Sequence, residues 1–210
     1  MKKIAAINGS PKPSGSATSK FIELLSGLTQ SEIATYQALK GLSQEDIEQI
    51  LESDCLVIAF PMYVDALPAP LIKALESIEL AEAKTTGSRP IVYAISNCGF
   101  FEASQNSTVL EMVENFAIAA GLPWGYGLGI GCGAVAASQL APKGPAAYVY
   151  KAIKSMAAAI SLNATQRENV FESARIPRVA YKIIGNLSFR LDARKSGAQK
   201  SINDKPHISQ

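Results

Sequence analysis

Short apolar runs alternate with amphipathic segments along most of this chain of 210 residues. The apolar runs, each typical of a buried β-strand, lie at 4–7, 33–36, 56–60, 91–95 and 124–130. Segments with helical periodicity lie at 17–27, 43–53, 69–81, 105–121 and 145–162. Strands that are apolar on both sides and alternate with helices indicate a parallel sheet covered on both faces. We therefore predict an α/β fold with a doubly wound sheet of five parallel strands.

The fifth apolar run has glycine at every second position, at 125, 127, 129 and 131. Large apolar residues occupy the positions between, starting with Trp124. A strand has a side-chain period of two, so this pattern predicts one apolar face and one face of bare backbone. Bare backbone permits the close approach of a helix or of a ligand. We favour helix packing as the explanation.

The first predicted strand and helix are joined by a loop rich in hydroxyl groups, Asn-Gly-Ser-Pro-Lys-Pro-Ser-Gly-Ser-Ala-Thr-Ser at 8–19. A helix N-terminus carries free N–H groups and a partial positive charge, so it attracts anions. The loop has neither G-x-G-x-x-G nor the glycine–lysine–serine of a P-loop. Many neutral donors suit a terminal phosphate monoester. The alternative is an ordinary connection in which Ser16 or Thr18 caps the helix.

Two further loops follow the third and fourth predicted strands, and ligands of doubly wound sheets bind at the carboxyl ends of such strands. The loop at 61–70 holds Met62 and Tyr63 between prolines, which suits packing on an aromatic ring or, alternatively, a stiff turn. The loop at 96–102 holds Asn97 and Gly99, whose amide groups suit a uracil-like edge. Glu102 could contact a ligand or stabilise the first turn of the following helix.

Composition excludes several classes of function. The net charge of +2 is too small to indicate nucleic-acid binding. No apolar run reaches the ~18 residues of a membrane span, and the apolar run at 4–7 is too short for a signal peptide. We therefore expect no integral membrane segment and a cytoplasmic location.

The cysteines and the histidine restrict the chemistry further. The three cysteines form no C-x-x-C pair, which argues against a metal or iron–sulfur site and against a disulfide framework. The single histidine, His207, is the fourth residue from the end, so a serine triad or a cysteine–histidine dyad is not expected. Cys98 therefore lacks a histidine base, and we interpret it as structural.

The C-terminal part of the chain differs in charge. From residue 173 onward eight basic residues face two acidic ones, a net charge of +6, whereas 12 basic and 16 acidic residues give −4 over 1–172. Apolar residues recur at every fourth position from 179 to 191, so a helix is plausible. We divide the chain into a main domain, 1–165, and a basic, partly helical extension, 166–210. The extension could dock on the domain or a partner subunit, act as a lid over a nucleotide phosphate, or bind a membrane surface or an acidic partner.

Taken together, the three loops resemble those of the flavodoxin-like NAD(P)H-dependent FMN reductases and quinone reductases. The resemblance rests on the segments at 7–19, 61–63 and 97–100 and covers about the first 135 residues. It departs at Ala17, where many relatives have asparagine. It implies a flavodoxin-like fold with FMN as cofactor and NADPH or NADH as hydride donor.

The resemblance also implies which residues bind the flavin. The phosphate would contact Ser10, Lys12, Ser16, Thr18 and Ser19; the ribityl chain and ring would contact Pro61, Met62, Tyr63 and Val64; the pyrimidine edge would meet Asn97, Gly99, Phe100 and Glu102. Ala17 and Cys98, in the same loops, complete the expected set of cofactor-binding residues. No catalytic side chain and no metal are expected, since the flavin carries the chemistry.

The function expected from this resemblance is an oxidoreductase that reduces a small acceptor such as a quinone or a flavin. A homodimer or larger homo-oligomer is expected with it. Two alternatives stay open, a flavodoxin-like electron carrier and a flavin-free binding or regulatory module. The net charge of +2 argues against the carrier, because such carriers usually have a strongly acidic surface.

Overall fold

The computed structural model describes residues 2–12, 14–29, 31–82, 89–175, 177–199, 201 and 204, with only the backbone of Glu82 and Ile184. His207, Lys200 and Lys205 lie outside the described residues. The chain divides into two compact units, Met1–Ala174 and Arg175–Gln210. The first unit therefore extends past residue 165, because a short strand at 170–172 belongs to it.

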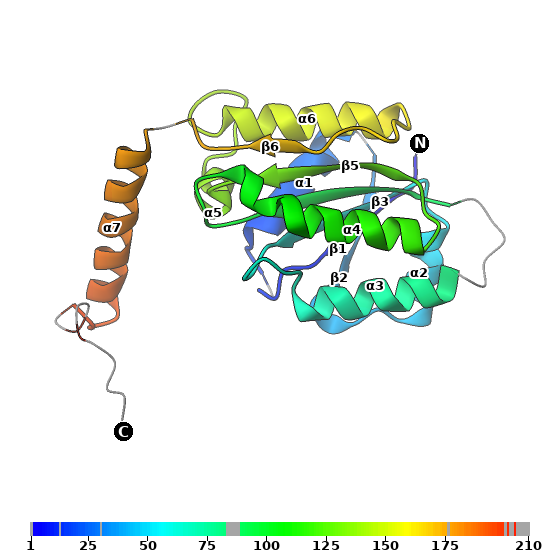
Figure 1. Cartoon of the computed structure of the whole chain (residues 1–210), viewed down its shortest axis with the longest axis horizontal. Helices are drawn as coiled ribbons and strands as arrows, with labels where there is room; N and C mark the ends of the chain where they lie inside the picture. Colours follow the sequence, from blue (N-terminus) through cyan, green and yellow to red (C-terminus); the bar gives the residue numbers. More distant parts are fainter. Residues whose placement is uncertain are drawn as a thin grey trace, which may run out of the picture. The chain divides into compact units, whose positions relative to one another are not determined.

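The first unit is built on a parallel sheet with the strand order β2-β1-β3-β4-β5-β6 (Figure 1). The strands are β1 (Ile4–Asn8), β2 (Ile33–Gln37), β3 (Cys55–Pro61), β4 (Ile91–Asn97), β5 (Trp124–Ile130) and β6 (Val170–Glu172). The predicted α/β class, the parallel sheet and the first five strands are confirmed. The predicted strand number of five is wrong, because β6 adds a sixth strand at the edge beside β5. Only three residues long and largely exposed, β6 has no long apolar run to reveal it.

Helices cover both faces of the sheet (Figure 1). One core cluster packs α2 (Gln44–Leu51), α3 (Ala69–Glu82) and α4 (Ser107–Ala119) on the sheet. The opposite cluster packs α1 (Ala17–Thr29), α5 (Gly133–Ser138) and α6 (Ala147–Ser161). Two short 3₁₀ turns, η1 (Ala38–Lys40) and η2 (Ala103–Asn106), follow β2 and β4. Among these helices only α5 was not predicted, since six small residues carry no helical periodicity.

A bulge in β5 changes the predicted faces of that strand. The pairing with β4 shifts between Val92 and Ala94, so that Trp124 packs in the cluster of α4 while Tyr126 packs in the cluster of α1 and α6. The strict alternation predicted from Trp124 onward is therefore wrong at its first step. A bulge inserts one extra residue and so reverses the side-chain alternation.

Atoms of other elements occupy the space beside the glycines of β5, but only Gly127 shows the predicted packing against an α-helix. A Cβ at Gly127 would lie 2.8 Å from a methyl carbon of Leu110 in α4, and one at Gly129 would lie 2.8 Å from the Phe171 ring of β6. Gly131 is tighter, because a Cβ there would lie 2.5 Å from the backbone oxygen of Phe101. These contacts hold the end of β5 against the loop that follows β4.

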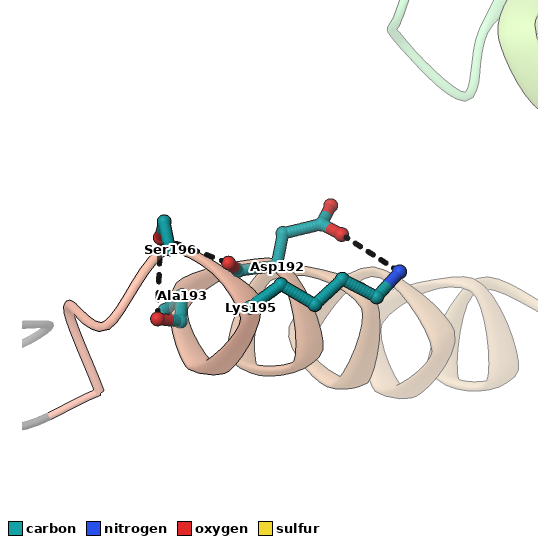
Figure 2. Close-up of polar contacts among 4 residues, drawn as sticks. All are labelled: Asp192, Ala193, Lys195 and Ser196. Atoms are coloured by element: carbon teal, nitrogen blue, oxygen red, sulfur yellow. Dashed lines mark hydrogen bonds and ion pairs between the residues drawn. The ribbon is translucent and has the colours of Figure 1, made fainter.

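The second unit contains one helix, α7 (Arg178–Lys195), among its described residues. Its C-terminal turn is closed by Ser196, whose hydroxyl donates to the carbonyl oxygens of Asp192 at 2.9 Å and Ala193 at 3.2 Å (Figure 2). An exposed ion pair joins Lys195 Nζ to Asp192 Oδ1 at 3.8 Å. The helix predicted from apolar residues at every fourth position is thus present as α7.

We predict that Gly131→Ala lowers the free energy of unfolding by about 1–3 kcal/mol, because the added methyl group would press on backbone atoms that cannot rotate away. The matched control is Gly27→Ala, in the exposed part of α1, where no atom lies within 4 Å of the new Cβ. That change should raise the free energy by about 0.4–1 kcal/mol. Urea denaturation of both variants measures the difference, and an equal effect of the two would contradict the packing described for β5.

Candidate functional site

A cleft of about 400 Å³ lies at the carboxyl ends of β1, β3 and β4. It sits where the strand order reverses between β1 and β3, the position at which doubly wound sheets bind ligands. All three loops singled out in the sequence contribute to it. Its lining is Ser10, Lys12, Gly15, Ser16, Ala17, Thr18, Lys20, Pro61, Met62, Tyr63, Asn97, Cys98, Gly99, Ala134 and Ala137.

The first loop is held by hydrogen bonds among its own hydroxyl groups. Ser16 precedes α1 and caps it, since its Oγ accepts the backbone N–H of Ser19 at 3.0 Å. The hydroxyl oxygens of Ser16 and Ser19 also lie 2.8 Å apart. Asn8 anchors both ends of the loop, because its Nδ2 donates to Ser19 Oγ at 3.0 Å and its Oδ1 accepts the N–H of Ser10 at 3.0 Å. The cap proposed as the ordinary alternative is thus present, and it leaves Ser16 lining the cleft.

Asn97, at the end of β4, connects the three loops. Its Nδ2 donates to Thr18 Oγ1 at 3.3 Å and to the carbonyl oxygen of Phe60 at 3.0 Å. The backbone carbonyl oxygen of Asn97 accepts the backbone N–H of Met62 at 2.8 Å. Asn97 and Thr18 are both buried. Because both amide protons of Asn97 are used within the protein, its side chain positions the cleft instead of offering donors to a ligand.

The second loop turns back sharply beyond the cleft. Tyr63 and Ala66 exchange two backbone hydrogen bonds of 3.1 Å, and the residues between them, Val64 and Asp65, have φ of 51° and 55°. Positive φ at both central positions defines a type I′ turn, which is unfavourable for β-branched valine. The Val64 side chain is 96% exposed and the Tyr63 side chain is 51% exposed. The turn therefore places an exposed aromatic residue at the rim of the cleft.

The third loop is stabilised from beneath by buried Asn106. Its Nδ2 donates to the carbonyl oxygen of Ala103 at 2.9 Å and approaches Cys98 Sγ at 3.3 Å, while its Oδ1 accepts the hydroxyl of Ser96 at 2.7 Å. Burial raises the pKa of the Cys98 thiol above its usual value. A neutral thiol is a poor nucleophile, in agreement with a structural role for Cys98.

The cleft contains most of the predicted site residues and omits four. Ser19 lies one layer behind Ser16, Val64 is at the tip of the turn, and Phe100 is 54% exposed outside the lining. Glu102 precedes η2 and is half-buried. These four residues do not line the cleft.

Several residues of the cleft were not predicted from the sequence. Gly15 and Lys20 belong to the first loop and the start of α1, and Ala134 and Ala137 come from α5. The two alanines could not be found without α5. Asn8 was not predicted as a site residue either, although an asparagine that starts a loop after a strand is typical of a side chain bonded to nearby backbone.

Solved structures of flavodoxin-like proteins share this fold, but sequence comparison finds no relative. No protein-family model matches the chain, and no curated protein matches it. An apo NADH:FMN oxidoreductase (EMOB) superposes with a TM-score of 0.61 at 11% identity, over 80% of this chain and 92% of that one. An NADPH-quinone reductase from P. pentosaceus gives 0.55 at 13% identity, over 75% and 98%.

The chain also matches part of a larger protein. It spans 35% of the rubredoxin oxygen:oxidoreductase of Desulfovibrio gigas, with a TM-score of 0.56 and 12% identity over 77% of this chain. At these identities the comparisons show a flavodoxin-like fold, which confirms the resemblance at the level of the fold.

We predict that Asn97→Ala lowers the free energy of unfolding by about 2–3 kcal/mol, since it breaks two buried hydrogen bonds and leaves their acceptors unsatisfied. Asn115→Ala, at an exposed position of α4, is the matched control and should change it by less than about 0.5 kcal/mol. Chemical denaturation measures both. Equal stability of the two variants would show that Asn97 does not connect the loops.

Proposed function

We propose that this protein is an FMN-dependent oxidoreductase that takes a hydride from NADH or NADPH and passes the electrons to a small acceptor such as a quinone or a flavin. The observation that carries the proposal is the composition of the cleft at the carboxyl ends of β1, β3 and β4. One end is lined by hydroxyl groups at the start of α1, and the other by Met62, Tyr63 and Gly99. A phosphate with a flat ring system attached matches both ends.

The hydrogen bonds of the first loop leave donors for an anion. Ser10 Oγ accepts the N–H of Lys12 at 3.2 Å, so its hydroxyl proton is left to donate to a ligand. Ser16 and Ser19 have two hydroxyl protons, and only one of them can lie between their oxygens. Because Ser16 lines the cleft, an anion there favours the arrangement in which Ser19 donates to Ser16 and Ser16 donates to the anion. The first N–H groups of α1 and the helix dipole add to this attraction.

Two lysines balance the charge of a phosphate in this position. Lys12 and Lys20 are exposed side chains that line the cleft. Lys12 Nζ lies 3.3 Å from the carbonyl oxygen of Gly15, so it already bends toward the loop. In solvent these charges contribute modestly to affinity, and the buried hydroxyl groups provide the geometry.

The other end of the cleft would hold the ring. Tyr63 offers a half-exposed aromatic side chain and Met62 a polarizable one. A Cβ added at Gly99 would have no atom within 4 Å, so there is space for a ligand beside this residue. Bound FMN would supply the hydride-accepting chemistry, and the chain's own residues would bind and orient it and exclude water from one face.

We predict that the purified protein binds FMN at least about 100-fold more tightly than riboflavin, because the phosphate would receive two or more charge-assisted hydrogen bonds. Ser10→Ala should weaken FMN binding about tenfold and leave riboflavin binding unchanged, since Ser10 lies at the phosphate end. Ser77→Ala, an exposed serine of α3, is the control. Fluorescence titration of the unchanged protein and of both variants with each flavin measures all six affinities.

The outcome separates the proposal from its rivals. A protein without affinity for FMN would be a flavin-free module, and the proposal would be wrong. Anaerobic mixing of the FMN-loaded protein with NADH and with NADPH should bleach the flavin on the timescale of turnover. FMN binding without bleaching by either nucleotide would instead identify an electron carrier.

A further inference from the structure

We propose that the C-terminal unit binds the surface of a membrane rich in anionic lipid, with α7 lying in the plane of the interface. The unit combines two properties that such a surface selects, exposed aliphatic side chains and a strong positive charge. The proposal is independent of the function proposed for the cleft.

The apolar part of this surface is a row of side chains along α7. Val179, Ile183, Leu187 and Leu191 are spaced four apart and are 55–68% exposed. Four-residue spacing keeps the row on one side of a helix, with a drift of about 40° at each step. Large apolar side chains exposed along a whole helix indicate a surface that is covered in use.

The charged part of this surface lies on the same segment. Residues 175–199 contain six basic residues and one acidic residue, a net charge of +5. The acidic residue, Asp192, faces Lys195 in an ion pair (Figure 2). Arg190 and Arg194 flank Leu191, and long basic side chains beside apolar ones can reach lipid headgroups while their stems stay in the apolar layer.

A lipid surface fits this segment better than a span, a nucleic acid or a second copy of the chain. Among the described residues no helix is long and apolar enough to cross a membrane, so α7 would lie on the surface. A nucleic acid offers phosphates but no apolar layer for the aliphatic row. In a second copy, residues 1–172 carry a net charge of −4. They would attract the basic segment less strongly than a surface of anionic headgroups does.

The attachment point of this segment on the first unit is fixed. Gly131 N–H donates to the carbonyl oxygen of Glu172 at 3.1 Å, and Ala103 N–H donates to Ser173 Oγ at 2.8 Å. β6 runs parallel to β5, so it ends on the side of the sheet where the carboxyl ends of the strands, and therefore the cleft, lie.

The test is co-sedimentation of the full chain with vesicles of equal parts phosphatidylglycerol and phosphatidylcholine, and with vesicles of phosphatidylcholine alone. The protein should pellet with the anionic vesicles at about 0.1 M salt and largely dissociate at about 1 M, where the Debye length falls to about 3 Å. Failure to pellet with the anionic vesicles would overturn the proposal, whether or not light scattering shows a dimer. Equal binding to neutral vesicles would overturn it as well.

Paired variants test the residues. Lys182→Gln/Lys195→Gln should weaken binding about 25-fold, at about fivefold for each lysine. Lys151→Gln/Lys154→Gln, exposed on α6, removes the same charge and should have an effect below about twofold. Ile183→Ser/Leu187→Ser should weaken binding at least about tenfold. The control Ile118→Ser/Leu162→Ser changes two exposed residues of the first unit and should have no effect on binding. If the variants in α7 and the control variants in the first unit lost vesicle binding equally, the assignment of the binding surface to α7 would be contradicted.

Discussion

The arrangement of the cleft depends on the buried amide of Asn97. This side chain joins the end of β4 to the end of β3 through Phe60 and to the start of α1 through Thr18. Three loops that are distant in sequence therefore have fixed positions relative to one another before any ligand enters. A site that is already organised spends less of its binding energy on ordering. The hydroxyl loop and the turn at Tyr63 then form two ends of one site and do not move as independent loops.

The first loop, at 8–19, caps α1 and forms the anion site with the same hydroxyl groups. Ser16 caps α1 with the acceptor side of its oxygen, and the pair of Ser16 and Ser19 retains a proton for a ligand. The interpretation of the loop as a helix cap and its interpretation as a phosphate site are therefore compatible. Asn8 makes them so, because it fixes Ser19 and Ser10 from the end of β1. An anion in this loop would meet donors that are already oriented, as electrostatic binding of phosphate requires.

Most of the fold and the positions of the three loops could be predicted from the sequence, because long apolar strands and hydroxyl or proline clusters are local signals. The elements that were missed have no such signal. β6 has three residues, and α5 consists of small residues that follow Cys132, a non-glycine residue with φ of 51°. The hydrogen bonds of the Asn97 side chain could not be predicted for a different reason. Its partners, Thr18 and Phe60, are 79 and 37 residues away, so only the folded chain shows that its donors are used.

Amide chemical shifts of the ¹⁵N-labelled protein test whether these connected loops form one flavin site. Addition of FMN should shift the amides of the non-proline residues at 10–19, 62–63 and 98–99 together, and inorganic phosphate should shift only those of the first loop. Shifts confined to residues away from the carboxyl ends of β1, β3 and β4, or no shifts at a saturating concentration of FMN, would show that the loops do not form a flavin site.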